Sequence, residues 1–418
     1  MRTTRPVPAM LPISVVLLLA LILPPADADA GPRRAPDTWP LVGARGVPTP
    51  AALREPGEGI VRAMHDLRIF VLARVWNELL TMPAVGALGG PDSGLSWQQT
   101  LDFADGRMAF RRVFTVEDGL GPHFNQVACA SCHMHPTLGG EGKGMDLRIH
   151  VRAPAHDAND TVSARMYAIA GAKLEDKGAG GQRRRTPPLF GLGRLDAIPD
   201  ATLAALVDPD DRNQDGVRGK LNARANKNGV TGPARFGHKS NDLNLLRFHA
   251  GALQGEMGIT NRLGRARAKD GDAVADPEVP DRFVVRIDGY VRGLAPPPAL
   301  PATPARTRGR RTFAEIGCTG CHRERIGAVE GAYTDLLLHD VGAKLSDGLT
   351  DNKAGPADWR TAPLWGLRHR SAYLHDQRTT SLTEAITLHG GEAARSAAAF
   401  AALPARRRAD LMGFLESL

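Results

Sequence analysis

Every cysteine of the chain lies in one of two copies of the motif Cys-x-x-Cys-His. The copies are Cys129-Ala-Ser-Cys132-His133 and Cys318-Thr-Gly-Cys321-His322. At this spacing, two thiols can bond to the two vinyl groups of one porphyrin, and the adjacent histidine can ligate the iron. One such motif could be half of a zinc site, and four cysteines in an exported protein could form two disulfides. Two complete motifs that leave no cysteine over instead predict two covalently bound haem c groups, with His133 and His322 as iron ligands.

A different chemistry is indicated by the polar run Asp211-Arg-Asn213-Gln-Asp215-Gly216. Its alternating oxygen donors followed by glycine match the first half of a calcium-binding loop. The twelfth position is Asn222 rather than the bidentate glutamate of a strong site. We therefore predict calcium at Asp211, Asn213 and Asp215, bound weakly or with ligands from elsewhere. The alternative is an ordinary turn rich in aspartate and glycine.

The N-terminus has the pattern of a cleavable signal peptide. Arg2 and Arg5 precede an apolar run at residues 11–23, and Ala28-Asp29-Ala30 supplies small residues for cleavage. The apolar run is shorter than a membrane-spanning helix needs. We predict export to the periplasm with removal of residues 1–30; the alternative is an uncleaved N-terminal anchor.

The chain is basic, with 53 lysines and arginines against 45 acidic residues and a net charge of +8. A basic exported protein could bind an acidic redox partner or a membrane surface, but a well-solvated surface is the simpler explanation. The runs 183–185 and 406–408 are short stretches of arginine without interleaved aromatic residues. This pattern argues against nucleic-acid binding.

The elements that must position the two motifs are predicted to be helices joined by long loops. Aromatic residues make up only 5% of the chain, and 46 glycines and 31 prolines interrupt it, which favours short helices over a large sheet. Apolar residues recur with helical spacing at 51–85, 200–206, 241–256 and 281–294. Asp200 is the expected cap of the second of these helices.

A proline-rich linker follows the helix predicted at 281–294, beginning at Ala295-Pro-Pro-Pro298. After it, a helix that carries Phe313 leads directly into the second motif, and the chain ends in an amphipathic helix. This is the layout of a small cytochrome c fold. We therefore expect a mostly α protein with two cytochrome c-like haem domains and long loops. The expected divisions are a signal peptide at 1–30, an N-terminal helical extension at 31–115, a first haem domain at 116–298 and a second at 299–418.

Longer segments around the motifs carry a family resemblance. They are Gly119-Leu-Gly-Pro-His-Phe-Asn125, Thr186-Pro-Pro-Leu-Phe-Gly-Leu-Gly-Arg-Leu-Asp-Ala-Ile-Pro199, Glu256-Met-Gly-Ile-Thr260, Asp335-Leu-Leu-Leu-His339-Asp340, Trp359-Arg-Thr-Ala-Pro-Leu-Trp-Gly366, Tyr373-Leu-His-Asp376 and His389-Gly-Gly-Glu-Ala393. Through them, most of residues 115–418 resembles the bacterial di-haem oxidoreductase family, often labelled thiol oxidoreductases. The chain is more distantly similar to the di-haem cytochrome c peroxidases and to the methylamine-utilisation di-haem enzyme. The thiol label does not suit these cysteines, since haem attachment consumes them.

The resemblance implies different roles for the two haems. In the peroxidase relatives the N-terminal haem reacts with peroxide and the C-terminal haem supplies electrons, so His133 would hold the reactive haem and His322 the electron-transfer haem. We expect a periplasmic oxidoreductase that takes electrons from a small redox protein or a quinol-linked donor and passes them to an oxidant such as peroxide. The rival is a non-catalytic di-haem electron-transfer cytochrome with both irons six-coordinate. A third reading is a haem enzyme that modifies another protein.

Three further residues are implied by the same resemblance. His389 lies on a predicted helix that Ser381-Leu-Thr-Glu384 starts as a capping box. It falls where the peroxidases have methionine and the methylamine enzyme has tyrosine, which makes it the expected distal ligand of the second haem. Glu256 is the candidate acid or base for peroxide chemistry. His238 stands in Arg-Phe-Gly-His-Lys, where the family has tryptophan, so an imidazole that could ligate iron replaces a bridging aromatic ring. The simpler alternatives are a partly exposed histidine, a surface glutamate and a solvated loop histidine, respectively.

The sixth ligand of the first haem is left open by the sequence. Its nearby candidates are Met134, His135, Met145 and His150. Three residues in the family-like segments are expected to shape the pocket of the second haem instead of binding iron. These are His339, Trp365 and His375.

The paired motifs predict two haems per chain that resist extraction with acid acetone, because thioether bonds survive denaturation. A pyridine haemochrome assay on the denatured mature protein measures both the number of haems and their attachment. One haem per chain, or free thiols in the mature protein, would contradict this prediction.

Overall fold

The computed structural model describes residues 73–142, 148–152, 162–173, 182–225, 231–264 and 270–418. They belong to one of two compact units of the chain, Leu67–Leu418. The predicted signal peptide and most of the helix predicted at 51–85 lie outside the described residues, although residues 73–81 are helical. None of the helices in the described ranges is long and apolar enough to cross a bilayer.

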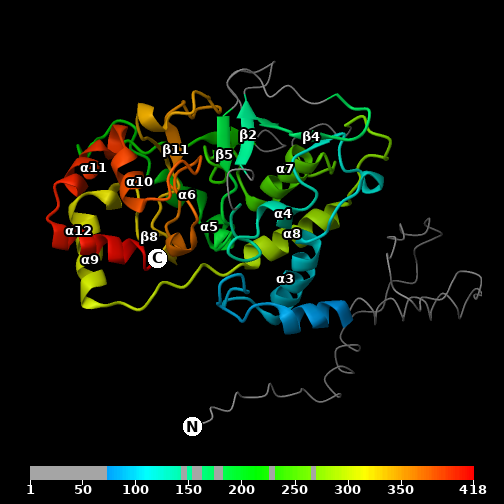
Figure 1. Ribbon diagram of the computed structural model, residues 1–418, viewed down its shortest axis with the longest axis horizontal. Helices are drawn as coiled ribbons and strands as arrows, with labels where there is room; N and C mark the ends of the chain where they lie inside the picture. The colour runs from blue at the N-terminus through cyan, green and yellow to red at the C-terminus, as the bar shows by residue number, and fades with distance from the viewer. Residues whose placement is uncertain (1–72, 143–147, 153–161, 174–181, 226–230, 265–269) are drawn as a thin grey trace, which may run out of the picture. The chain divides into compact units, whose positions relative to one another are not determined.

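Helices make up most of the regular structure, and the strands form short antiparallel pairs (Figure 1), which confirms the expected mostly α class with long loops. The helices are α3 (Trp97–Phe110), α4 (Cys129–Cys132), α5 (Leu192–Asp196), α6 (Asp200–Ala204), α7 (Leu245–Met257), α8 (Asp281–Gly293), α9 (Pro304–Glu315), α10 (Leu382–Leu388), α11 (Ala394–Ala401) and α12 (Ala405–Leu415). The strand pairs are β1 (His123–Phe124) with β4 (Tyr167–Ala168), β2 (Arg148–Arg152) with both β3 (Val162–Ala164) and β5 (Gln182–Arg185), β6 (Ala223–Ala225) with β7 (Thr231–Pro233), β8 (Arg325–Ile326) with β9 (Val329–Glu330), and β10 (Leu338–Asp340) with β11 (Asp358–Arg360).

Capping residues decide where the predicted helices begin. α7 starts at Leu245, later than the apolar spacing indicated, because the Asn244 side chain accepts a hydrogen bond from the Arg247 amide at 3.0 Å. α8 follows its predicted range closely. In α6, Asp200 lies in the first turn and does not cap the helix, which corrects the sequence prediction. Its carboxylate pairs with Arg235 instead.

The first hydrophobic core forms where α3 crosses α8. Gly106 permits the close approach, because a Cβ atom there would lie 2.9 Å from the Tyr290 Cβ. The Tyr290 ring contacts Phe103 and Phe110, with both pairs of ring centroids 5.0 Å apart. Phe110 in turn lies 6.0 Å from the ring of His133. Thus α3, which the sequence prediction placed in the extension 31–115, packs in the core that supports the first haem motif.

The second core repeats this arrangement where α9 crosses α12. A Cβ atom at Gly309 would collide with the backbone carbonyl of Asp410. The ring of Phe313 lies 5.7 Å from Phe414 and 6.3 Å from His322. In both cores, therefore, the helix before a haem motif crosses a later helix at a glycine.

A third apolar cluster joins residues on both sides of the proline-rich linker. Leu195 and Leu203 pack there with Ile326 and Trp365. The side chains of the two halves of the unit are thus packed into a shared cluster. The division at residue 299 stays a prediction.

Buried charges add specific connections between the same parts of the chain. Arg184 pairs with Asp347 at 2.7 Å, and both side chains are almost fully buried. Glu141 accepts hydrogen bonds from Arg185 at 3.2 Å and from the Ser371 amide at 2.7 Å. Breaking a buried pair by removing one partner typically costs about 3–5 kcal/mol, because the other charge is left uncompensated.

The glycine crossing in the second core predicts the effect of adding a single methyl group. Gly309→Ala should destabilise the holoprotein by roughly 1–3 kcal/mol, because the helices must move apart. The matched control is Gly413→Ala on α12, where an added Cβ meets no atom within 4 Å. Denaturant unfolding of both variants with their haem content measured should separate them. Equal midpoints would show that the crossing tolerates a side chain.

Candidate haem sites

The first motif presents His133 in the form that ligates iron. The Nδ1 atom of His133 lies 3.0 Å from the Gly140 carbonyl oxygen, so Nδ1 carries the proton and Nε2 is the atom left for a metal. Burial lowers the pKa of His133 to about 4, against the opposing effect of the Gly140 hydrogen bond. The imidazole is therefore neutral at physiological pH, as iron ligation requires.

The second motif repeats this chemistry and adds a second histidine. His322 Nδ1 lies 3.0 Å from the Tyr333 carbonyl oxygen, and burial lowers the pKa of His322 to about 4. His389 follows the last residue of α10, and its Nδ1 lies 2.7 Å from the Ala385 carbonyl oxygen. Burial lowers the pKa of His389 as well, and its charge would further lower the pKa of His322. The two rings are thus electrostatic neighbours, each with Nε2 available.

The capping of α10 differs in part from the predicted box. The Ser381 side chain accepts a hydrogen bond from the Glu384 amide at 3.2 Å. The Glu384 carboxylate does not return to the Ser381 amide but accepts from the Thr379 hydroxyl at 2.5 Å. The helix still begins at the expected residue, so His389 reaches the end of its last turn.

A cavity of about 280 Å³ is lined by both His322 and His389. We call it the second cavity, after the second motif. Its wall includes the two cysteines and the histidine of the second motif, four further histidines and two tryptophans. They are Cys318, Cys321, His322, His238, His339, His375, His389, Trp359 and Trp365. Burial raises the pKa of Cys318 to about 12, which disfavours a thiolate.

Two arginines place positive charge on the wall of this cavity. Arg360 donates to the carbonyls of Gly237 at 2.9 Å and Thr361 at 3.4 Å, and burial lowers its pKa to about 10. Arg185 pairs with Glu141, but its buried Nε has no hydrogen-bond partner among the described residues. A haem has two carboxylate groups at one edge, so the residues present fit this cofactor in both its apolar body and its charged edge.

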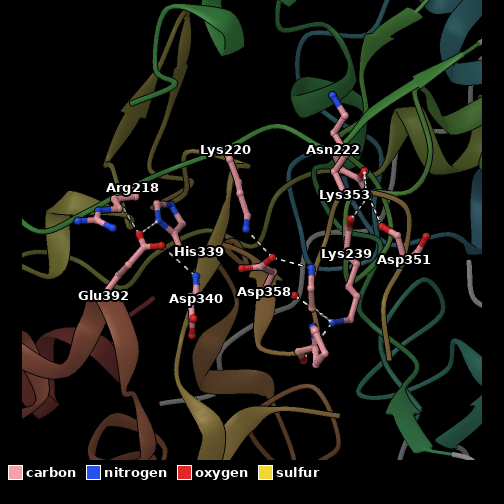
Figure 2. A network of polar contacts seen from close by, with 12 residues as sticks. Arg218, Lys220, Asn222, Lys239, His339, Asp340, Asp351, Lys353, Asp358 and Glu392 are labelled. Atoms are coloured by element: carbon pink, nitrogen blue, oxygen red, sulfur yellow. Dashed lines mark hydrogen bonds and ion pairs between the residues drawn. The ribbon is translucent and has the colours of Figure 1, made fainter. Parts of the chain in front are cut away.

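His339 lines the cavity but cannot ligate iron in its present contacts. Its Nδ1 donates to Glu392 at 2.7 Å and its Nε2 to Asp335 at 2.9 Å. Burial opposes the charge, but these carboxylates outweigh it and raise the pKa of His339 to about 12. Glu392 also accepts from the amides of Arg218 and Asp340, as Figure 2 shows. His339 is therefore a cation that ties segments of the wall together.

His238 lies on the wall of the second cavity. Its Nε2 donates to the Arg185 carbonyl at 2.8 Å, and its ring meets Trp359 edge-on with centroids 6.2 Å apart. Trp359 stacks on His375 at 3.8 Å. No described contact joins His238 to Glu256, so the two predicted catalytic residues are not brought together. The catalytic role of His238 stays a prediction.

Glu256 lies beside the first motif, near the end of α7. Its Oε2 accepts a hydrogen bond from the Asn125 side chain at 2.6 Å, and the Asn125 amide donates to the Glu256 carbonyl at 2.6 Å. Burial raises the pKa of Cys132 to about 12, and the Glu256 carboxylate adds to that effect. A carboxylate is thus positioned next to a haem-attachment cysteine.

The candidates for the sixth ligand of the first haem differ in exposure, in location and in whether the structure describes them. The Met134 side chain is 53% exposed. His135 lies in a small separate pocket with Glu141. Met145 and the side chain of His150 lie outside the described residues. The sequence prediction missed His249, a buried histidine on α7 whose sequence signal is a polar residue among the apolar positions of a helix.

The predicted calcium loop uses its oxygens internally. Asp211 Oδ1 accepts from the Gly216 amide at 3.0 Å, and Asp215 Oδ1 accepts from Val217 at 2.8 Å. Asn222 is buried and donates to two backbone carbonyls away from the loop. Calcium at Asp211, Asn213 and Asp215 stays a prediction without support from this geometry.

Comparison with known protein families gives a match over most of the chain. Residues 140–418 match the family described as "Di-haem oxidoreductase, putative peroxidase". No curated protein matches the chain in sequence. Among solved structures, hydrazine synthase of Kuenenia stuttgartiensis is 15% identical with a TM-score of 0.41, covering 93% of this chain and 100% of that one. A variant of the diheme peroxidase BthA from Burkholderia thailandensis is 13% identical with a TM-score of 0.42, covering 80% and 89%. A MauG-like protein associated with microbial copper homeostasis is 16% identical with a TM-score of 0.30, covering 55% and 89%.

The pairing of His322 with His389 predicts a low-spin second haem. His389→Ala should convert one low-spin haem to a high-spin or water-ligated form, because the ring nitrogen that would ligate the iron together with His322 is removed. His389→Met should restore a low-spin haem with a higher reduction potential. The control is Thr383→Ala on the exposed side of the same helix. Electron paramagnetic resonance distinguishes these states, and spin states unchanged in His389→Ala would reject the assignment.

Proposed function

Because the chain belongs to the di-haem oxidoreductase family, we propose that it is a periplasmic peroxidase-like enzyme with one covalent haem c at each motif. His322 and His389 would hold the second haem, at which electrons would enter, and His133 would hold the first haem, to which they would pass. When bound, the first haem supplies the redox chemistry toward peroxide. The protein supplies ligands, charge and proton transfer.

The observation that carries this proposal is a difference between two helices that begin alike. α7 and α10 are both capped by a side chain that accepts from the third amide of the helix, Asn244 in α7 and Ser381 in α10. Eight residues after the cap, α10 is followed by His389, whereas α7 has Ala252. An alanine cannot ligate iron. The first site therefore lacks the counterpart of the ligand that closes the second, which favours a reactive first haem and an electron-transferring second haem.

A carboxylate stands at the first site in place of that ligand. Glu256 continues α7 beyond Ala252 and is oriented by Asn125. The Asn125 side chain is itself fixed, because its Oδ1 accepts from the Met166 amide at 2.9 Å. A carboxylate held in this way can serve as an acid or base in the cleavage of peroxide.

One short segment connects the two sites. Pro187 lies on the wall of the second cavity, and its carbonyl raises the pKa of His133, which places the same residue beside the first iron ligand. Leu192 also lines the second cavity while packing against the first core. A path of this kind suits electron transfer from the second haem to the first through packed protein.

The proposed function requires two kinds of partner, an electron donor and a small oxidant. A small redox protein or a quinol-linked donor delivers electrons to the second haem, and peroxide or another small oxidant accepts them at the first. The predicted signal peptide at residues 1–30 supports a periplasmic location. The rival function, a non-catalytic electron-transfer cytochrome, requires a sixth protein ligand at the first haem as well.

The proposal predicts that Glu256→Gln slows the reaction with hydrogen peroxide by at least roughly a hundredfold, because a general acid or base contributes two to four orders of magnitude in rate. Both haem spectra should remain intact, since glutamine can keep a contact with Asn125. Stopped-flow mixing of peroxide with oxidised and with half-reduced protein measures the rate.

Glu117→Gln, an exposed carboxylate outside the site, is the control. Wild-type protein that reacts with peroxide in neither oxidation state would favour the electron-transfer rival. A peroxide reaction indifferent to Glu256→Gln would remove that residue from the mechanism.

A further inference from the structure

His249 and Asp288 form a buried polar pair between α7 and α8. His249 is only 7% exposed, and neither of its ring nitrogens has an aligned hydrogen-bond partner among the described residues. Its Nδ1 lies 3.3 Å from Asp288 Oδ1. Burying polar groups without full hydrogen bonding is costly, so the contacts of the described residues do not account for a histidine at this position.

Asp288 is held as an anion that faces this ring. Its Oδ2 accepts from Arg292 Nε at 2.6 Å, and Arg292 also pairs with Asp196. Burial raises the pKa of Asp288, but His249 and Arg292 outweigh it, and the pKa is lowered overall. A carboxylate beside Nδ1 favours the tautomer with the proton on that nitrogen, which leaves Nε2 as an acceptor.

The ring belongs to the surroundings of the first haem motif. His249 and Glu256 are seven residues apart on α7 and therefore share one face of the helix. After burial and backbone hydrogen bonding, the charge of His249 is among the effects on the pKa of His133, and the charge of Glu256 is among those on Cys132. One face of α7 thus lies along the first motif, with an imidazole and a carboxylate on it.

The second haem site has an apolar residue at the position equivalent to His249. Counted from the caps of α7 and α10, the fifth residue is His249 in one and Ile386 in the other. Ile386 lines the second cavity and packs against the second core together with Met412.

The position of Asp288 can be matched to a residue of the second site in the same way. Tyr290 and Phe414 are the aromatic residues at the two glycine crossings, and two residues before them stand Asp288 and Met412. An isoleucine and a methionine at the second site are therefore replaced by a histidine and an aspartate at the first. Packing does not explain this replacement, because apolar residues fill the same place elsewhere in the molecule.

We propose that His249 Nε2 accepts a proton from the peroxide molecule that reacts at the first haem, with Asp288 as its positioning residue. The inference rests on the proposed function. In this step an O–H bond of hydrogen peroxide breaks, the proton bonds to Nε2, and the electron pair stays on the hydroperoxide anion. The Asp288 carboxylate stabilises the imidazolium that forms. No electron is transferred in the step, and the proton is available later for the oxygen that leaves as water.

Cyanide binding to the oxidised protein tests this role without turnover. Hydrogen cyanide must lose its proton to bind ferric iron, so a nearby proton acceptor speeds its association. His249→Leu should slow cyanide association at one haem about a hundredfold, and should slow the peroxide reaction by a similar factor. His249→Gln serves as a second variant that keeps a polar side chain in the buried site.

Two further variants separate positioning from general damage. Asp288→Asn should slow cyanide association less than His249→Leu does, and Asp288→Glu should recover most of the loss, because it restores the carboxylate beside Nδ1. Gly251→Ala on the same helix, where an added Cβ meets no atom within 4 Å, should leave both rates unchanged.

Unchanged cyanide and peroxide rates in both His249 variants would overturn the inference. Conversion of a low-spin haem to high spin in His249→Leu would also overturn it, since His249 would then be an iron ligand. Wild-type protein that ignores peroxide would refute the proposed function and the peroxide step with it, whereas slowed cyanide association would still identify His249 as a proton acceptor.

Discussion

A buried neutral imidazole with its Nδ1 proton held by a backbone carbonyl is the interaction on which both candidate haem sites depend. His133 uses the Gly140 carbonyl and His322 the Tyr333 carbonyl, each at 3.0 Å. The hydrogen bond selects the tautomer and fixes the ring plane, and burial keeps the ring uncharged. Both conditions require that the loop carrying the carbonyl be immobile. Tyr333 meets this requirement through its own ring, which packs on Phe414 with centroids 5.6 Å apart.

The repeated helix crossing explains how one chain can support two such sites with different surroundings. The glycines of α3 and α9 and the aromatic rings that cover them set the geometry in both cores. Positions that face away from this crossing are free to differ, because they do not determine how the helices approach. The difference between Ala252 and His389, and between the pair His249–Asp288 and its apolar counterpart, lies at such positions. A duplicated scaffold therefore carries an asymmetric pair of sites.

Two cations lie close to the ring of Trp359 on the wall of the second cavity. Trp359 has Lys239 Nζ at 4.4 Å and the Arg184 guanidinium at 5.3 Å from its ring centroid. A cation over an indole ring is attracted to the π electrons of the ring. Its positive charge also makes removal of an electron from the ring harder. His238 offers no easily oxidised ring either. These cations disfavour electron movement by oxidation of Trp359.

The sequence alone determined what depends on neighbours within a turn or on periodic spacing. The two Cys-x-x-Cys-His motifs, the helix α8 and the place of His389 at the end of α10 are of this kind, because a few adjacent residues specify each of them. The start of α7 required the cap at Asn244 to be recognised. Only the tertiary structure decided that His339 is locked between two carboxylates and that His238 faces the second cavity. It alone placed His249 against Asp288, because those contacts join residues far apart in the chain, and burial changes the protonation of a side chain in ways that its sequence neighbours do not encode.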